Sequence, residues 1–520
     1  MKKGFVLITL VALLQPALDA QQKKKAAAGP SNENDYYRLI TLPLPEEVVM
    51  EVGGLDWLDK DKNRLMACTR RGDLWLVDNP YADPAKLGTL SPAGKGPNPK
   101  DADPASTVRF KRMLFGLHEP LGLLTQPDGI YMAQRSELTR VKDTDGDDRI
   151  DLVETICNEW DISGSYHEYA FGPKLDRDGN MWITLNRPFG GGQEATAYWR
   201  GWAVKVDKKG KMHPVCPGLR SPCGIGSNPE GDMFYTDNQG DWVAVCKLSH
   251  LKHGLFQGNP IGLESCSHPL STMKHPGKGL PKSGLDWGEA VKQMPFLVPP
   301  AVWFPYPEMG RSHSDFIYDN TGGKFGPFHN QLFVGDQGNA IIVRVFLEKV
   351  DGEYQGACFP FRKGFASGVL RMCWGKDGSM FVGGTNRGWG GGPKPYGLER
   401  LVFTGKTPFE VLEMKATPQG FRVTFTEPAD PATAGDVKSY DMQAWTYRYH
   451  ADYGDKPQKQ QSLKITKATV SDEGKTVDLI VEGCLPYYVH ELRLNGVRNR
   501  DGQGLLHPIG YYTLNRVPKG

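Results

Sequence analysis

The residues with the clearest capacity for chemistry lie in two polar segments of the chain, 165–173 and 218–242. His167, in the first segment, can take a proton from a hydroxyl group near neutral pH. Arg220, in the second, carries a rigid fork of donors that suits a carboxylate. It is followed by three residues whose oxygen atoms suit Ca²⁺, namely Asp237, Asn238 and Gln239. These residue types predict a proton-transfer site with a carboxylate contact and a calcium ion.

The same residues also permit an interpretation without chemistry. His167 would then cap a strand, Arg220 would pair with a nearby acid, and Asp237 with its neighbours would form only a turn. Both interpretations stay open on the residue types alone.

A second candidate metal site is the acidic loop 143–154, where carboxylates stand at loop positions 1, 3, 5, 9 and 12. This register wraps oxygen ligands around Ca²⁺, and so many neighbouring acids would repel one another without a cation. Asp148 stands where such loops usually have glycine, and the flanks look more like a propeller loop than paired helices. The candidate metal residues here are Asp143, Asp145, Asp147, Arg149, Asp151 and Glu154. The alternative is a solvated acidic turn.

The elements that must position these residues are short β-strands. Apolar runs such as 179–185 and 231–236 each follow an Asp-Gly or Glu-Gly turn, which is typical of successive strands. The pattern recurs at uneven spacing, with strands expected at 74–77, 128–132, 179–185, 231–236, 332–334 and 377–382. Six copies predict an all-β fold with a six-bladed β-propeller over residues 36–407 and a channel mouth for ligands. An all-β sandwich without a propeller is the alternative.

Further polar clusters stand at comparable positions of the repeat, including 69–72, 134–137 and 385–389. Taken singly, each is an ordinary solvated loop. Taken together, they would line one end of the channel, where Arg70, Arg135 and Arg387 would make the mouth basic.

Two regions depart from the repeat. Residues 254–307 are rich in Gly, Pro, Lys and His and have little strand pattern, which predicts an insertion that forms a lid or an interface. After Pro408 several segments alternate apolar and polar residues, and residues 408–520 are predicted to form a small immunoglobulin- or fibronectin-like β-sandwich with a structural role.

The beginning of the chain has the features of an export signal. Residues 1–20 combine two lysines, an apolar run and a small residue before Gln21, and residues 21–35 are expected to be a disordered linker. The apolar run is too short for a permanent membrane span, so a periplasmic or secreted protein is expected, with an uncleaved anchor as the alternative.

Composition excludes several classes of function. The 520 residues include 62 basic and 60 acidic side chains, a formal net charge of +2, so no global field indicates nucleic acid or an acidic membrane surface. A small-molecule ligand is the better expectation. The nine cysteines are an odd number, and Cys216 and Cys223 either bridge the Arg220 loop or are buried free thiols.

The two polar segments also carry a resemblance to a known family. Residues 166–185 resemble the catalytic-histidine segment of soluble dehydrogenases of glucose and aldose sugars that depend on pyrroloquinoline quinone (PQQ), and residues 218–242 resemble their cofactor and Ca²⁺ loops. Residues 53–516 resemble the exported sorbosone-dehydrogenase-like propellers of planctomycete-type bacteria. The resemblance implies a six-bladed propeller in which His167 is the base and Ca²⁺ binds near Asp237.

The cofactor contacts that the resemblance implies are Arg220, Ser221, Arg371 and Arg387. The chain departs from the family pattern at three places. Ser221 replaces an Asn, the segment 337–339 has no Lys, and the Arg371 region keeps one of two arginines.

The leading functional hypothesis is therefore an exported PQQ- and Ca²⁺-dependent oxidoreductase that acts on a sugar or a related alcohol or aldehyde. An external electron acceptor, such as a cytochrome c, would be required. The alternatives are a non-redox propeller of the lactonase or lyase kind that uses His167, and a propeller that binds carbohydrate or protein without chemistry.

Overall fold

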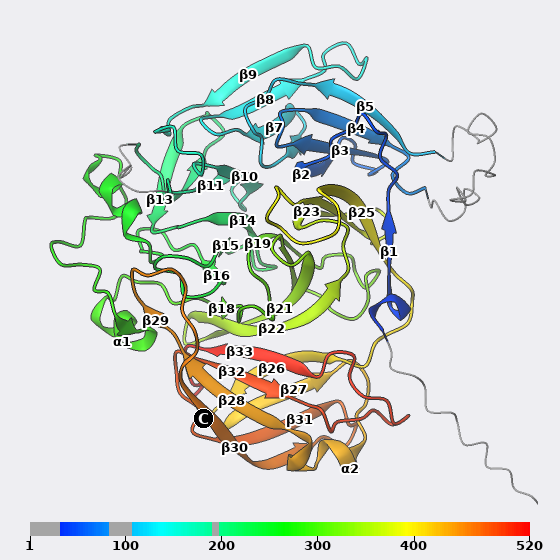
Figure 1. Ribbon diagram of the computed structural model, residues 1–520, viewed down its shortest axis with the longest axis vertical. Helices are drawn as coiled ribbons and strands as arrows, with labels where there is room; N and C mark the ends of the chain where they lie inside the picture. Colours follow the sequence, from blue (N-terminus) through cyan, green and yellow to red (C-terminus); the bar gives the residue numbers. More distant parts are fainter. Residues whose placement is uncertain (1–31, 83–106, 190–196, 520) are drawn as a thin grey trace, which may run out of the picture. The chain divides into compact units, whose positions relative to one another are not determined.

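The computed structural model describes residues 32–82, 107–189 and 197–519, which form an all-β structure with two short α-helices (Figure 1). The predicted signal peptide and most of the predicted linker lie outside the described residues. No helix in the described part of the chain is long and apolar enough to cross a membrane.

Five antiparallel four-stranded sheets stand alone. The first contains β2 (Val52–Trp57), β3 (Arg64–Thr69), β4 (Leu74–Asp78) and β5 (Arg109–Leu114). The second contains β6 (Leu124–Gln126), β7 (Gly129–Ala133), β8 (Leu138–Lys142) and β9 (Leu152–Cys157). The third contains β10 (Ala170–Leu175), β11 (Met181–Leu185), β12 (Trp202–Val206) and β13 (Met212–Pro217). The fourth contains β14 (Pro222–Ser227), β15 (Met233–Asp237), β16 (Lys247–His250) and β18 (Val302–Trp303).

The remaining separate sheet joins distant parts of the chain. Its strands are β23 (Val369–Trp374), β24 (Met380–Thr385), β25 (Tyr396–Phe403) and β1 (Tyr37–Thr41). Because β1 pairs with β25, the first strand of the described residues completes the sheet made by β23, β24 and β25. This pairing closes the ring.

The innermost strands of neighbouring sheets contact one another around the ring, and β23 contacts β2 to complete it. At the closest points, which glycines occupy, the backbones leave no room for a side chain. A Cβ atom on Gly122 would lie 1.9 Å from the carbonyl oxygen of Gly172, and one on Gly224 would lie 2.1 Å from that of Ser314. This ring of radial sheets is a β-propeller, as the sequence predicts.

The number of separate blades differs from the prediction. The structure has five, not six, because β19 (His313–Tyr318), β20 (Leu332–Asp336), β21 (Ile341–Val350) and β22 (Glu353–Lys363) belong to a larger sheet of eleven strands. β22 pairs with β33 (Ile509–Leu514), so its outer edge is covered by the C-terminal region. Covering a long edge strand in this way prevents it from pairing with other chains.

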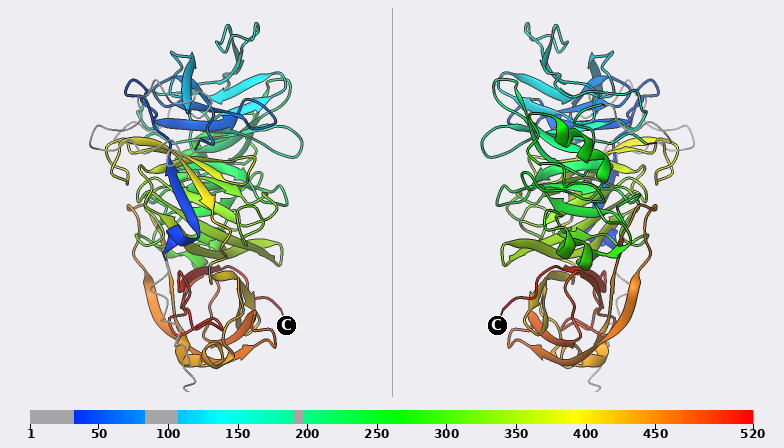
Figure 2. Two further views of the ribbon diagram at one scale, coloured as in Figure 1. Left: turned by 90° about the vertical axis from the view of Figure 1, so that its right-hand side faces the viewer. Right: turned by 90° about the vertical axis from the view of Figure 1, so that its left-hand side faces the viewer.

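The C-terminal strands continue that sheet, so a separate sandwich over residues 408–520 is not confirmed. Beyond β33 the order is β32 (Tyr488–Arg493), β28 (Asp441–Thr446), β30 (Gln458–Val470), β31 (Thr476–Glu482), β27 (Gly420–Phe425) and β26 (Val411–Thr417). Figure 2 shows these strands, coloured from yellow through orange to red, curving around a common interior. Phe421, Val423 and Met442 are among the buried side chains that fill it.

The segment 254–307 packs onto the propeller through short elements. They are the 3₁₀-helix η4 (Pro260–Ser267), β17 (Leu285–Asp286), α1 (Trp287–Gln293) and β18. β17 pairs with β29 (Arg448–Tyr449) of the C-terminal region. The described residues also include α2 (Pro431–Ala434) and the 3₁₀-helices η1 (Glu33–Asp35) and η5 (Val437–Ser439).

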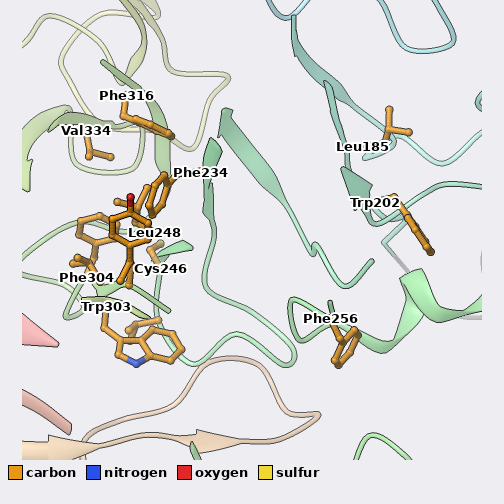
Figure 3. Close-up of a cluster of buried hydrophobic side chains, with 14 of the residues drawn as sticks. Leu185, Trp202, Phe234, Cys246, Leu248, Phe256, Trp303, Phe304, Phe316 and Val334 are labelled. Atoms are coloured by element: carbon orange, nitrogen blue, oxygen red, sulfur yellow. The ribbon is translucent and has the colours of Figure 1, made fainter. Parts of the chain in front are cut away.

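The largest buried cluster lies between the sheets. Figure 3 shows Phe234 and Leu248 of the fourth sheet beside Phe316 and Val334 of β19 and β20. Burial of each such side chain contributes about 1.5–3 kcal/mol. This packing fixes the strand ends from which the loops of the candidate site emerge.

Candidate active site

A cavity of about 370 Å³ brings together part of the predicted site. Six of the predicted residues line it, namely His167, Arg220, Ser221, Asn238, Gln239 and Arg387. Other lining residues come from distant parts of the chain, among them Arg70, Asn186, Phe189, Arg311, Ser312, Gln337, Trp389 and Tyr453. Within the described chain, no residue of the predicted lid 254–307 lines this cavity.

His167 lies in a turn just before β10, where the buried Glu168 holds the backbone. The Glu168 carboxylate accepts hydrogen bonds from the backbone N–H groups of Ser163, Gly164 and Ser165 at 2.8–3.2 Å. The His167 ring centroid is 4.5 Å from that of Phe189. Among the described residues no hydrogen-bond partner occupies either ring nitrogen, so both are available to a ligand.

The charge state of His167 suits a base. Burial, and then the positive charges of Arg387, Arg220, Arg135 and Arg187, lower the pKa of His167 below its usual value of 6.5. The imidazole is therefore neutral at pH 7 and able to accept a proton.

Arg220 is held by a buried carboxylate at the end of β15. The backbone N–H groups of Arg220 and Ser221 donate to Asp237 at 3.1 and 2.7 Å, and that of Asn238 donates to it at 3.1 Å. Burial raises the pKa of the Asp237 carboxyl, while the buried Lys247 amine and these N–H groups oppose that rise. Asp237 therefore shapes the loop, and its carboxylate is already occupied.

The neighbouring loop repeats this arrangement. Arg311 and Ser312 donate their backbone N–H groups to Asp336 at 2.8 and 2.6 Å, and Asn339 donates to it at 2.6 Å. Asp336 is fully buried at the end of β20, as Asp237 is at the end of β15. The two loops present an arginine each to the same cavity.

Arg387 approaches His167 from the loop after β24. Its guanidinium group donates to the hydroxyl groups of Tyr166 and Tyr169 and lies 5.3 and 4.7 Å from their ring centroids. Its backbone has φ +57°, a strained conformation for a side-chain residue that is often found at functional sites. Its Nε atom is buried without a partner among the described residues.

The cavity has an excess of positive charge. Arg70 is neutralised by Glu51 and Glu119 at 3.0 and 2.9 Å, and Arg220 pairs with Asp241 at 2.9 Å. No carboxylate in the described part of the chain pairs with Arg311 or Arg387. An anionic ligand would therefore be favoured there.

Arg371 lies elsewhere, near the axis of the ring. It is 4% exposed, and its guanidinium group donates to the carbonyl oxygens of Gly53, Leu121 and Leu370 at 2.8 Å and of Cys223 at 3.3 Å. These donors are used to join the inner strands, so Arg371 does not reach the ligand cavity. Cys216 and Cys223 are both buried free thiols.

The acidic loop gathers part of the predicted calcium set. Carboxylate oxygens of Asp143, Asp145 and Asp151 lie within 4.8 Å of one another. Asp148 adopts φ +64°, the conformation for which such loops normally use glycine. Asp147 accepts from the backbone of Arg149, and Glu154 pairs with Arg140 at 2.8 Å, so these residues lie outside the cluster.

Sequence reasoning missed several lining residues. Arg311 had a usable signal, because Arg-Ser followed by a strand ending in Asp occurs at both 220–237 and 311–336. Tyr453 had none, since it lies in the C-terminal region, far along the chain from every other lining residue. Asn186 and Phe189 follow β11, and no motif distinguishes them from an ordinary loop.

Comparison with known proteins finds solved structures of low similarity. No protein-family model matches the sequence, and no curated protein matches it. A glucose dehydrogenase of Thermus thermophilus has 15% identity and a TM-score of 0.46 over 70% of this chain and 100% of that one. The PQQ-bound aldose sugar dehydrogenase of Streptomyces coelicolor has 12% identity and a TM-score of 0.45 over 70% and 98%. A calcium structure of a Trichoderma reesei family AA12 protein has 12% identity and a TM-score of 0.43 over 71% and 96%.

Proposed function

We propose that the protein is an exported oxidoreductase that uses PQQ and Ca²⁺ to oxidise a sugar or a related alcohol or aldehyde. The single observation that carries the proposal is the neutral His167, without a hydrogen-bond partner among the described residues, in a cavity where Arg311 and Arg387 have no carboxylate partner from the described chain. That combination suits a reaction in which a hydroxyl proton is removed next to an anionic cofactor.

The lining residues fit PQQ, which is a flat ring system with several carboxylates. The volume of about 370 Å³ falls in the range of roughly 300–1,000 Å³ that is usual for small-ligand sites. Arg220, Arg311 and Arg387 would hold the carboxylates, and Phe189 would pack against the flat rings. The orphaned Oδ1 of Asn186 and Nε of Arg387 are buried polar atoms that a ligand could satisfy.

Asn238 and Gln239 are the residues that would hold a calcium ion in this cavity. Both line it, and amide oxygens are hard ligands that suit Ca²⁺. Asp237 would act only through the backbone that it organises, because its carboxylate already accepts three N–H groups.

The reaction then divides between cofactor and protein. When bound, PQQ supplies the acceptor for the two electrons and the hydrogen of the substrate carbon. A ring nitrogen of His167 takes the hydroxyl proton, so the alcohol leaves as a carbonyl compound. Burial, and then the positive charges of the nearby arginines, lower the pKa of His167 and keep it neutral before the transfer. Reoxidation requires an external acceptor, for which a cytochrome c is our proposal, and export is proposed from residues 1–20.

The test is His167→Gln, which keeps a polar side chain of similar size. We expect turnover to fall by roughly 10²- to 10⁴-fold, the usual effect of losing an acid-base group. PQQ affinity and the melting temperature should hardly change. A dye-linked dehydrogenase assay, a spectroscopic PQQ titration and a melting curve on one purified variant measure all three.

The matched control is His213→Gln, because His213 lies on β13, pairs with Asp207 at 2.9 Å and does not line the cavity. It should leave turnover unchanged. The proposal fails if calcium-loaded wild-type protein binds no PQQ, or if His167→Gln retains full activity.

A further inference from the structure

The C-terminal region reaches the cavity through residues 447–457, a segment between β28 and β30 that we call the C-terminal arm. The arm contains β29 and lies against the propeller in Figure 1. Tyr447 and Tyr449 accept hydrogen bonds from the backbone N–H groups of Trp287 and Gly284 at 2.9 and 2.8 Å. The hydroxyl of the buried Tyr449 donates to the carbonyl of Gly258 at 2.6 Å.

The arm is also fixed on the side that faces the cavity. The N–H of Trp242 donates to the carbonyl of His450 at 3.0 Å, and that of Gly454 donates to the carbonyl of Gly240 at 3.0 Å. The N–H of Asp455 donates to the carbonyl of Ala244 at 2.8 Å. Backbone hydrogen bonds therefore flank Tyr453 on both sides, and its position is set by the fold rather than by its own packing.

Tyr453 itself is poorly covered. Its side chain is 72% exposed, it lines the cavity, and its ring centroid lies 5.4 Å from the guanidinium carbon of the buried Arg220. A ring that is so exposed adds little to stability, and holding it at the cavity wall has no packing purpose.

Two other aromatic side chains at the cavity are also exposed. Tyr166 is 58% exposed and Trp389 is 52% exposed, and both line the cavity with Tyr453. We call these three side chains the aromatic rim. Beside them are the amide side chains of Asn238 and Gln239.

We propose that Tyr453, carried by the C-terminal arm, is a substrate-binding residue that packs against the ring of a neutral sugar. A pyranose has an apolar C–H face that suits an aromatic ring and hydroxyl groups that suit amides. Arg220, at 7% exposure, and the partly buried His167 lie more deeply in the cavity than the aromatic rim. A substrate that binds after the cofactor would therefore contact the rim. The inference rests on the proposed function for the identity of the substrate.

The experiment measures sugar binding separately from sugar oxidation. D-glucose, D-xylose and cellobiose are titrated calorimetrically into calcium-loaded protein with and without PQQ. Tyr453→Ala should weaken binding of the best of these sugars by roughly tenfold, as expected when one aromatic contact is lost. Tyr453→Phe, which keeps the ring, should stay within about twofold of wild type. In turnover, KM should rise in Tyr453→Ala while kcat stays within about threefold.

Phe115→Ala is the matched control. Phe115 is 71% exposed, close to the value for Tyr453, and does not line the cavity. This variant should bind sugar as wild type does, and melting curves should show that all three variants are folded.

The outcomes separate the two proposals. If Tyr453→Ala weakens sugar binding but the protein reduces no dye, the role of the arm is supported and the proposed oxidoreductase function is overturned. Dye reduction with unchanged sugar affinity and KM in Tyr453→Ala overturns the arm's role alone. Wild-type protein that binds none of the sugars also overturns it.

Discussion

The loop that presents Arg220 and the loop that presents Arg311 share a backbone design but differ in what surrounds the guanidinium group. In both, a fully buried aspartate at a strand end accepts the N–H groups of an Arg-Ser pair. Arg220 is then paired with Asp241 and is 7% exposed. Arg311 is exposed, and no carboxylate of the described chain pairs with it.

This difference shows that the same loop backbone can hold one arginine in place and leave the charge of another available to a ligand. The shared aspartate fixes the backbone, so each arginine starts from a defined position. The paired Arg220 is held rigidly beneath Phe189 and Tyr453, at 4.5 and 5.4 Å from their ring centroids. The unpaired Arg311 keeps its charge available for a ligand, and little of its side chain is committed to the protein.

The largest expected effect follows from removing each arginine. Arg311→Gln should lower PQQ affinity by roughly 10- to 100-fold, about 1.5–3 kcal/mol, because a charge-assisted hydrogen bond is lost. The free energy of unfolding should change by less than about 0.5 kcal/mol, as for other surface substitutions. Arg220→Gln should lower both quantities, since Asp241 then keeps only Arg187 as an ion-pair partner among the described residues. Spectroscopic titration and chemical denaturation measure the two effects.

Arg177→Gln is the control for charge alone, because Arg177 is exposed in the turn between β10 and β11 and does not line the cavity. It should leave PQQ affinity unchanged. The proposed difference between the two loops is contradicted if Arg311→Gln destabilises the fold as much as Arg220→Gln does, or if the PQQ affinity of Arg311→Gln equals that of wild type.

The sequence predicts the Arg220 and Arg311 loops only as far as the residues that indicate each loop lie close together in the chain. The strand ends and their polar loops follow from periodicity and turn residues over a few positions, so the Arg220 loop was predictable. Arg311 could have been found from the same local pattern read a second time. Its loop follows the long segment 254–307, which interrupts the repeat and hides the correspondence.

The positions of Arg371 and of the aromatic rim could not be predicted from local sequence patterns. An arginine near the start of an inner strand can point toward the cavity or toward the ring axis, and only the packed structure decides. Arg371 faces four carbonyl groups. Tyr453 reaches the cavity through pairings with residues 240–244 and 283–287, and separations of about two hundred residues leave no periodicity in the sequence. The eleven-stranded sheet has the same kind of origin, in the pairing of β22 with β33.

A second difference between the two loops is the residue after Arg-Ser, which is Pro222 in one and His313 in the other. His313 is fully buried and stacks on Phe304 with a centroid distance of 3.9 Å. Burial lowers the pKa of His313 to about 4, although the nearby Asp336 opposes the shift. The unfolded chain, with a pKa near its usual 6.5, therefore binds the proton more readily than the folded protein.

This sign makes stability fall as the pH falls from 6.5 toward 4. Between pH 6.5 and pH 5, His313 should cost about 2 kcal/mol of unfolding free energy, at about 1.4 kcal/mol per pH unit. His313→Phe should remove that share of the dependence, while His253→Phe, at an exposed position, should not. Chemical denaturation at pH 7 and pH 5 gives the comparison. An equal loss in wild type and His313→Phe would contradict it.

The smallest expected effect concerns calcium, and it tests whether the Asp237 loop or the acidic loop is the stabilising metal site. Asp237 is a single, fully buried carboxylate, whereas the partly buried Asp143 and the exposed Asp145 and Asp151 bring carboxylate oxygens within 4.8 Å of one another. Ca²⁺ at tenfold its dissociation constant should stabilise the protein by about 1.4 kcal/mol. Chelation should therefore lower the melting temperature, and added Ca²⁺ should restore it. The double variant Asp145→Asn with Asp151→Asn should remove the part of this response that the acidic loop contributes, while Asn238→Ala should keep that part. A melting temperature that is indifferent to chelator would exclude a stabilising calcium ion in the acidic loop.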